Sequence, residues 1–157
     1  LSSATFFILD SIDRRESHAK LERLSFEDTL TGVFNRNKFN HDIEEFKVSR
    51  LSDVGVAYFD INGLKQVNDT LGHIEGDRLI KKTACVINDI FKGETYRIGG
   101  DEFVVIAMGF NETDFNNGVE NVLRGFSCRD ISVSVGVSWA ENTEKLEECL
   151  TSADNRM

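Results

Sequence analysis

The sequence predicts an α+β fold of ferredoxin-like type, in which an antiparallel sheet is flanked by helices. Behind one leading helix, strand and helix patterns follow in the order helix, strand, helix, helix, strand, strand, helix, strand, helix. Two of the strands are separated by only a short glycine-containing turn, which joins antiparallel neighbours. The length of 157 residues fits one domain with a short extra element.

The leading helix is predicted from "DSIDRRESHAKLERLSF", residues 10–26. Apolar side chains lie loosely on one of its faces, so the helix is amphipathic. A weak heptad permits a parallel coiled coil, although two of its core positions are charged. The heptad positions are Leu9, Ile12, Glu16, Ala19, Arg23 and Phe26. Packing of the helix on its own domain explains the same pattern.

The next two elements are a capped helix and a buried strand. Asn35 is a good N-cap for "RNKFNHDIEEFKVSR", in which Phe39, Ile43 and Phe46 recur at helical spacing. "DVGVAYFDI", residues 53–61, is a run of β-branched and aromatic residues that ends in an acid. This pattern is typical of a buried strand that delivers Asp60 to its C-terminal end.

The remaining elements follow from periodicity and turn residues. Residues 63–71 and 75–91 predict two helices separated by Gly72-His73. "TYRI" and "EFVVIAMGF" flank Gly99-Gly100 as a hairpin. "ETDFNNGVENVLRGF" predicts a helix, "DISVSVGVSWA" alternates as a strand, and "NTEKLEECLTSADNRM" predicts a final helix.

Composition excludes several classes of partner. Lys and Arg number 18 against 27 Asp and Glu, so the formal charge of −9 repels nucleic acid backbones and anionic membrane surfaces. The three cysteines lack zinc-ligand spacing, which indicates reduced packing residues in a cytosolic protein. The apolar run at residues 6–9 is far shorter than the roughly 20 residues of a membrane span. No signal peptide is visible.

Three acids are predicted to meet at one edge of the sheet. Asp101 and Glu102 lie at the tip of the hairpin, and a neighbouring "VAYFDI" strand would bring Asp60 to the same end. Carboxylates that lie this close to one another repel each other unless a cation pairs with them. Mg²⁺ is the expected cation, because it takes oxygen ligands from carboxylates and substrate phosphates. Taken singly, "DE" also fits a polar turn and Asp60 a strand-end cap.

The segment after Asp60 adds residues suited to a nucleotide. Lys65 is a candidate phosphate partner, and the backbone N–H groups of Gly63 and Leu64 at a helix N-terminus are further anion donors. Asn68 and Asp77 match guanine, whose N1–H and N2–H₂ donors suit a carboxylate and whose O6 suits an amide. Adenine lacks that donor pair. Each of these residues alone also fits a solvent-facing helix position.

Four stretches together resemble the GGDEF family of diguanylate cyclases. They are "DTLTGVFNR" (28–36), "FDINGLKQVNDTLGHIEGDRL" (59–79), "YRIGGDEF" (96–103) and "SVSVGVS" (132–138). The resemblance implies a palm-like cyclase fold that condenses two GTP into cyclic di-GMP with release of pyrophosphate. It also implies a homodimer, in which the two GTP sites face each other. Residues 1–26 would then be a signalling helix from an upstream sensor module and residues 27–157 the GGDEF domain.

The resemblance assigns roles to individual residues. Asp60, Asp101 and the Ile61 carbonyl are similar to the family's ligands of Mg²⁺ or Mn²⁺. Glu102 matches the second hairpin acid, which is a metal ligand or helps to deprotonate the attacking 3′-hydroxyl. The substrate-binding positions are matched by Asn68 and Asp77 for guanine, by Lys65, Gly63 and Leu64 for phosphate, and by Gly99 and Gly100, where a Cβ would obstruct the nucleotide.

The chain departs from the family pattern at three places. Ile90 and Gly93 occupy the positions of an inhibitory Arg-x-x-Asp motif, so we expect no product inhibition through that site. Asn62 stands where the family has a second acid. "SADNRM" resembles the start of the family's last helix, and the Lys and Arg that normally reach the phosphates are expected beyond Met157.

The sequence therefore predicts a cytoplasmic, Mg²⁺-dependent diguanylate cyclase output domain that a sensor module before Leu1 drives into dimers. The alternative is a catalytically silent GTP-binding or dimerisation module that regulates a partner domain. A third interpretation is a receptor for cyclic di-GMP. The hairpin acids favour the first, and the missing arginine motif disfavours the third.

Overall fold

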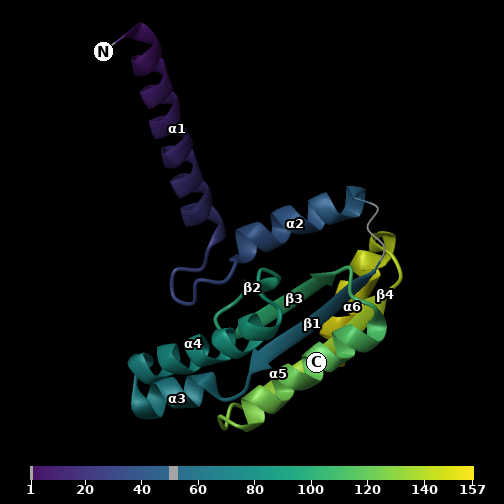
Figure 1. Ribbon diagram of the computed structural model, residues 1–157. Helices are drawn as coiled ribbons and strands as arrows, with labels where there is room; N and C mark the ends of the chain where they lie inside the picture. Colours follow the sequence, from purple (N-terminus) through teal and green to yellow (C-terminus); the bar gives the residue numbers. More distant parts are fainter. Residues whose placement is uncertain (1, 50–52) are drawn as a thin grey trace.

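The computed structural model describes residues 2–49 and 53–157, and only the backbone of residues 22–24. Its four-stranded antiparallel sheet has the strand order β2-β3-β1-β4, which confirms the predicted α+β class (Figure 1). The strands are β1 (Val54–Ile61), β2 (Thr95–Arg97), β3 (Glu102–Met108) and β4 (Val133–Ala140). The helices are α1 (Ser3–Phe26), α2 (Arg36–Val48), α3 (Leu64–Leu71), α4 (His73–Ile90), α5 (Glu112–Ser127) and α6 (Leu146–Arg156).

Element boundaries differ from the predicted ones mainly at helix starts. α1 begins at Ser3 rather than at residue 10, since the Ser2 hydroxyl accepts a hydrogen bond from the Thr5 N–H at 3.3 Å and caps the helix. The predicted N-cap of α2 is confirmed, because the Asn35 side chain accepts from the Lys38 N–H. The final helix begins later than predicted, behind a 3-10 turn at Thr143–Lys145. Residue 50, at the predicted end of the second helix, lies outside the described residues.

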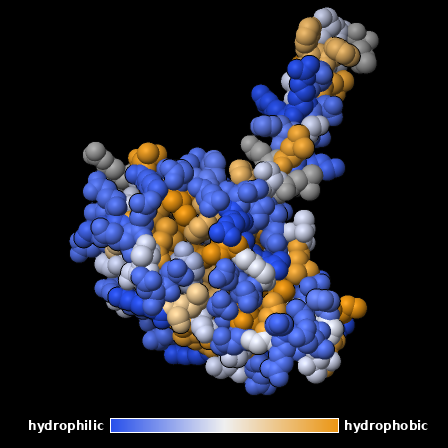
Figure 2. All heavy atoms as spheres, turned by 180° about the vertical axis from the view of Figure 1, so that it is seen from behind, coloured by the Kyte–Doolittle hydropathy of each residue, from blue (hydrophilic) through white to orange (hydrophobic). Residues whose placement is uncertain are grey.

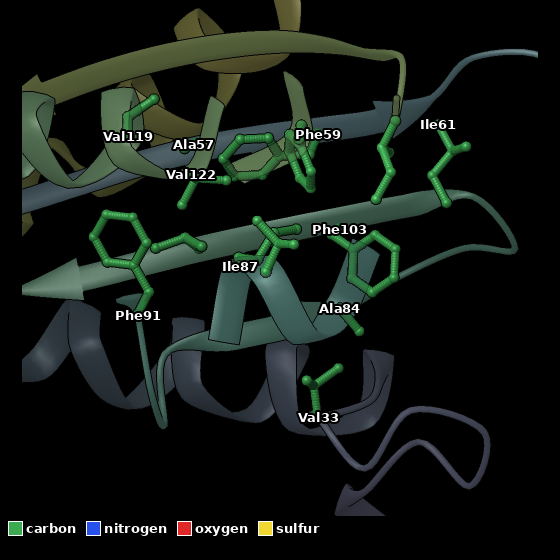
Figure 3. Packing of buried hydrophobic residues seen from close by; sticks show 14 of the residues in the cluster. Val33, Ala57, Phe59, Ile61, Ala84, Ile87, Phe91, Phe103, Val119 and Val122 are labelled. Atoms are coloured by element: carbon green, nitrogen blue, oxygen red, sulfur yellow. The ribbon is translucent and has the colours of Figure 1, made fainter. Parts of the chain in front are cut away.

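One face of the sheet packs against α4 and α5. Ala57 and Phe59 of β1 point to this side, where they join Ile87 of α4 and Val122 of α5 in one buried cluster (Figure 3). The Phe59 ring meets Phe126 of α5 edge-on, with centroids 5.9 Å apart. Burial of each such large side chain stabilises the fold by about 1.5–3 kcal/mol. This layer therefore anchors β1, the strand that ends in Asp60.

The opposite face of the sheet is covered by α2 and α6. Val54 and Val56 of β1 pack there with Phe39 of α2 and with residues of α6. The backbone of α6 approaches β4 closely, because a Cβ on Gly136 would lie 1.8 Å from the Ala153 carbonyl oxygen. Side chains alternate along a strand, so Asp60 points to this second face.

α1 projects away from the rest of the molecule (Figure 1). Its apolar side chains are exposed, with Phe6 64% and Phe7 68% accessible, and apolar groups recur along it in Figure 2. Packing of this helix along its own domain, one of the two interpretations of the sequence, is therefore wrong. Near the end of α1, the Phe26 ring lies 5.3 Å from that of His41. No helix among the described residues has the length and apolar character of a membrane span.

Four of the heptad positions in α1 are also exposed, and Phe26 is partly exposed. Leu9 is 53% and Ile12 46% exposed, and Glu16 and Ala19 are exposed as well. The side chain of Arg23 lies outside the described part of the chain. α1 thus presents an apolar surface that its own domain leaves uncovered.

A buried polar group lies beneath α2. The Tyr96 hydroxyl donates to the Asp42 carboxylate at 2.6 Å, and the Lys38 ammonium lies 2.9 Å from the same carboxylate. Glu94 comes two residues before Tyr96, and its Oε2 is buried without a hydrogen-bond partner among the described residues. Burial raises the pKa of Glu94 to about 7.

We expect Glu94 to make stability depend on pH. Because its folded-state pKa lies above its ordinary value of 4.5, the contribution of Glu94 to the free energy of unfolding is largest below about pH 4.5 and is lost as pH rises through about 7. Glu94→Gln removes this dependence, so the variant is more stable than wild type at pH 8. Urea unfolding between pH 5 and pH 8 measures the effect. Glu141→Gln, at an exposed position, is the control, and equal pH slopes for wild type and Glu94→Gln would contradict the expectation.

Candidate nucleotide and metal site

Two neighbouring strands place the acids together. Asp60 of β1 is paired directly with Glu102 of β3, so both side chains lie on the same face of the sheet. Asp101 precedes β3, and its carbonyl accepts the Ile61 N–H at 2.9 Å. The structure therefore brings all three carboxylates to one end of the sheet. Their role as metal ligands remains a prediction.

The electrostatics of these acids suit a cation. Burial and the neighbouring Asp101 charge raise the pKa of Asp60 above its ordinary value. Within the described residues, the carboxylates of Asp60, Asp101 and Glu102 take part in none of the hydrogen bonds or ion pairs. An oxygen-only set of carboxylates, with the Ile61 carbonyl beside it, matches the preference of Mg²⁺. The residues present therefore fit the divalent cation that the motif implies.

Tyr58 is a site neighbour that the sequence analysis missed. It lies two residues before Asp60 on the same face of β1. Its pKa is raised to about 12 by burial and by the charges of Asp154 and Glu102, while the nearby Arg36 acts in the opposite direction. The period of two along β1 was the signal that could have identified it.

The hairpin glycines differ in their surroundings. A Cβ on Gly99 would lie 2.7 Å from the Glu102 Oε2, so this glycine gives the carboxylate its space. A Cβ on Gly100 would meet no atom within 4 Å, and Gly100 is exposed. Open space above Gly100 is compatible with the predicted approach of a nucleotide.

The departure at Asn62 has a structural explanation. The Asn62 Nδ2 donates to the Ser132 hydroxyl at 3.1 Å, and the Ser134 hydroxyl donates to the Asn62 Oδ1 at 3.0 Å. The Asn62 N–H also donates to the Ser132 carbonyl at 2.9 Å. Asn62 thus ties the end of β1 to β4. Sequence reasoning treated it only as a lost charge, because its partners are distant in the chain.

The predicted phosphate contacts lie where α3 begins. Gly63 is the N-cap of α3 with φ of 74°, a left-handed conformation that favours glycine. The first N–H groups of a helix have no partner within it, so those of Gly63 and Leu64 are available to an anion. Lys65 is exposed beside them. Their role in binding phosphate remains a prediction.

The predicted guanine contacts come from two packed helices. Asn68 of α3 lies against α4, since a Cβ on Gly76 would lie 1.8 Å from the Asn68 Oδ1. Asp77 is the next residue after Gly76 and is exposed. The α3–α4 pair therefore places the Asn68 amide against the residue that precedes Asp77. The role of both residues in recognition of a purine edge remains a prediction.

A second group of metal-ligating side chains lies on α2. It consists of His41, Asp42 and Glu45, whose ligand atoms lie within 4.8 Å of one another. The Asp42 oxygens, however, already contact the Lys38 ammonium and the Tyr96 hydroxyl. A cation there would have to compete with Lys38, whereas Asp60, Asp101 and Glu102, within the described residues, have no such competing cation but do not bring their oxygens equally close together.

The positions of the family's inhibitory motif are at the C-terminal end of α4 and in the turn that follows it. Ile90 is the last residue of α4, and Gly93 follows in a turn with φ of 78°. Neither side chain can form an ion pair. The expected lack of product inhibition through them remains a prediction.

Comparison with known families decides the classification. The family model described as "Diguanylate cyclase, GGDEF domain" matches residues 25–157. The chain belongs to the GGDEF family. The match contains all of the candidate site residues, and it places the chain among domains of cyclic di-GMP signalling.

Relatives of this GGDEF domain carry two kinds of name. It is 29% identical over 139 residues to "Probable diguanylate cyclase DgcI" of Escherichia coli. The matched region covers 85% of this chain and 30% of DgcI. It is 32% identical over 108 residues to "Cyclic di-GMP phosphodiesterase PdeR" of the same organism, covering 66% of this chain and 16% of PdeR. The chain thus spans less than a third of the length of either relative.

Solved structures share the fold. The coiled coil and GGDEF domain of DgcB from Caulobacter crescentus, in complex with c-di-GMP, matches with a TM-score of 0.82 at 24% identity and covers 98% of this chain and 92% of that one. Diguanylate cyclase SiaD from Pseudomonas aeruginosa, in complex with its activator SiaC, matches with a TM-score of 0.76 at 26% identity, covering 98% of this chain and 64% of SiaD.

We expect Gly76→Ala to displace the Asn68 amide. The added Cβ would overlap the Asn68 Oδ1, and the end of that side chain can rotate away without unfolding the helices. Alanine is the better helix former, so stability is retained while the affinity for GTP falls by about tenfold, the effect of losing roughly 1.4 kcal/mol of hydrogen bonding. Titration calorimetry measures the affinity, and NMR of the Asn68 side-chain amide reports the displacement.

Gly125→Ala is the matched control, because its added Cβ would meet Val86 in α4 and none of the candidate site residues. It should leave GTP affinity unchanged. An Asn68 amide signal that does not move in Gly76→Ala would contradict the packing argument.

Proposed function

We propose that this domain is a diguanylate cyclase, which condenses two GTP molecules into cyclic di-GMP and releases two pyrophosphates. The observation that supports this most is the direct pairing of Asp60 with Glu102 across β1 and β3, with Asp101 beside them. Silent modules of this kind have no need of three unpaired carboxylates, which destabilise the site in the absence of a cation. The retained acids therefore favour catalysis.

Asp60, Asp101, Glu102 and the Ile61 carbonyl would hold Mg²⁺ or Mn²⁺. When bound, the cation neutralises the triphosphate and lowers the pKa of the 3′-hydroxyl. Asp77 accepts hydrogen bonds from the guanine N1–H and N2–H₂, and Asn68 contacts O6. Lys65 and the N–H groups of Gly63 and Leu64 bind phosphate oxygens.

The reaction joins two GTP molecules in two identical steps, each of which forms a bond between a 3′-oxygen and an α-phosphorus. The 3′-oxygen of one GTP attacks the α-phosphorus of the other, and the bond from that phosphorus to the pyrophosphate oxygen breaks. Glu102 accepts the hydroxyl proton. Since each site holds one GTP, two domains must face each other to align both attacks.

A homodimer follows from this mechanism, and α1 provides a surface for it. The exposed apolar side chains of α1 would be buried by the same helix of a second copy. In the parent protein we propose that α1 connects an upstream sensor to the cyclase and that the domain acts in the cytoplasm.

A silent regulatory module is the second candidate. Relatives named cyclic di-GMP phosphodiesterases match this chain at 32% and 34% identity over 108 and 105 residues. A GGDEF domain therefore occurs in proteins whose named activity is the opposite one. Such a module would bind GTP or a partner and form no cyclic di-GMP.

Asp101→Ala tests the catalytic proposal. We expect it to abolish cyclic di-GMP formation from GTP and Mg²⁺, because the hairpin ligand is lost, while the fold is kept. Chromatography of the reaction products measures turnover, and calorimetry measures Mg²⁺-dependent GTP binding. Asp89→Asn, at an exposed position of α4, should behave as wild type. If the wild-type domain binds GTP but forms no cyclic di-GMP, even at protein concentrations at which it is dimeric, it is the silent module instead.

Asp77→Ser tests the choice of base. The shorter hydroxyl accepts fewer hydrogen bonds from guanine, so the preference for GTP over ATP should narrow by about tenfold, equivalent to roughly 1.4 kcal/mol. Dissociation constants for both nucleotides measure this. Asp69→Ser, also exposed and on α3, is the control. An unchanged GTP/ATP ratio in Asp77→Ser would remove Asp77 from base recognition.

A further inference from the structure

The hydrogen bonds of Asn62 run to one neighbouring segment. Its N–H, its Nδ2 and its Oδ1 bond to the Ser132 carbonyl, the Ser132 hydroxyl and the Ser134 hydroxyl, at 2.9, 3.1 and 3.0 Å, respectively. Ser134 is in turn paired with Asp60 across β4 and β1, so the two side chains lie on the same face of the sheet. Asn62 therefore joins the end of β1 to the start of β4 next to a predicted metal ligand.

This anchor sets the direction of the peptide group between Ile61 and Asn62. The described residues contain no cis peptide bond, and in a trans peptide the carbonyl and the N–H point in opposite directions. Since the Asn62 N–H points to Ser132, the Ile61 carbonyl points to the other side, toward β3. The Ile61 N–H agrees with this, because it donates to the Asp101 carbonyl at 2.9 Å. The anchor thus directs the Ile61 carbonyl toward the acids.

The sheet leaves the Ile61 carbonyl without its usual partner on that side. Two residues of a hydrogen-bonded antiparallel pair exchange two N–H···O bonds. In the described part of the chain, Ile61 and Asp101 form one of them, and no bond returns from the Asp101 N–H to the Ile61 carbonyl. The ladder opens at this point, and a lone pair of the carbonyl oxygen is available to a cation.

Position 62 also sets the charge of the site. Asn62 follows Asp60 by two residues of extended chain, so it lies about 7 Å farther along the same face. A carboxylate at this position could accept hydrogen bonds from both serine hydroxyls, since a hydroxyl rotates to donate. Holding the end of β1 therefore does not require an amide. The amide instead avoids a fourth negative charge beside Asp60, Asp101 and Glu102, which would repel them.

We infer that Asn62 is a positioning residue of the metal site, which holds the Ile61 carbonyl toward the acids without adding charge and so keeps the affinity for a free divalent cation low. A cation then binds tightly only together with a nucleotide, whose phosphates supply further oxygens and negative charge. The inference rests on the proposed metal and GTP site, and it concerns Mg²⁺ or Mn²⁺ rather than the base.

Titration of the nucleotide-free chain with Mn²⁺ measures the charge effect, with free Mn²⁺ followed by electron paramagnetic resonance. Asn62→Asp should bind Mn²⁺ about tenfold more tightly than wild type, as expected for one added charge about 7 Å from a divalent ion in a water-like dielectric. Asn116→Asp is the matched control, since it adds the same charge at an exposed position of α5, which packs on the opposite face of the sheet. Equal affinities in wild type and Asn62→Asp would overturn the inference.

Hydrogen exchange measures the positioning separately. Asn62→Ala removes both side-chain bonds, so the amides at positions 62–64 should exchange about tenfold faster relative to their intrinsic rates. Its Mn²⁺ affinity should also fall, because the Ile61 carbonyl is less well fixed. Asn62→Asp should exchange as wild type does, since its carboxylate still bonds both serines, and Asn116→Ala is the control. Unchanged exchange and Mn²⁺ affinity in Asn62→Ala would show that the backbone bond alone holds the turn, which overturns the positioning role.

Asp101→Ala separates the inference from the proposed function. It should remove Mn²⁺ binding from wild type and from Asn62→Asp alike. If it does so while Asn62→Asp binds Mn²⁺ as wild type does, the metal site stands and the inference fails. Mn²⁺ binding that is insensitive to Asp101→Ala contradicts the proposed metal site, and the inference with it.

Kinetics connects the charge to the reaction. With GTP present, the Mg²⁺ concentration that gives half-maximal cyclic di-GMP formation should be lower in Asn62→Asp than in wild type. An unchanged Mg²⁺ requirement would overturn the link between Asn62 and catalysis. A wild-type chain that forms no product contradicts the proposed cyclase, and the Mn²⁺ titration still decides the inference.

Discussion

The pairing of β1 with β3 is the constraint on which the candidate site depends. Its register sets Asp60 opposite Glu102, and hydrophobic residues on both faces of β1 hold that register. A slip of one residue would turn the core residues of β1 toward the wrong layer, so the sheet cannot relieve the repulsion between the acids by sliding. The free energy of core burial thus maintains an arrangement of like charges that is unfavourable by itself.

The two faces of the sheet are covered by different pairs of helices. α4 and α5 cover one face, and α2 and α6 cover the other (Figure 1). On the second face Tyr58, Asp60 and Glu102 are partly exposed. The same α4 that seals the core also packs with α3 to present Asn68 and Asp77. The predicted base contacts and the core therefore share one helix.

Two electrostatic environments meet at the hairpin. On one side the acids lack partners and Asp60 has a raised pKa; on the other, Asp28 is paired with Arg97 and has a lowered pKa. The net charge of −9 repels an approaching triphosphate unless a cation accompanies it. A site of this kind is suited to a metal-bound nucleotide rather than to a bare one.

The sequence by itself determined the types of the elements, the cap of α2, the hairpin at Gly99-Gly100 and the identity of the candidate site residues. These features are local, since they depend on periodicity, turn residues and short motifs. Only the tertiary structure decided the register of β1 against β3, the projection of α1, the Asn62 contacts to β4 and the bridge from Arg97 to Asp28. The last two join residues 70 and 69 positions apart, and such contacts arise from packing that no local pattern records.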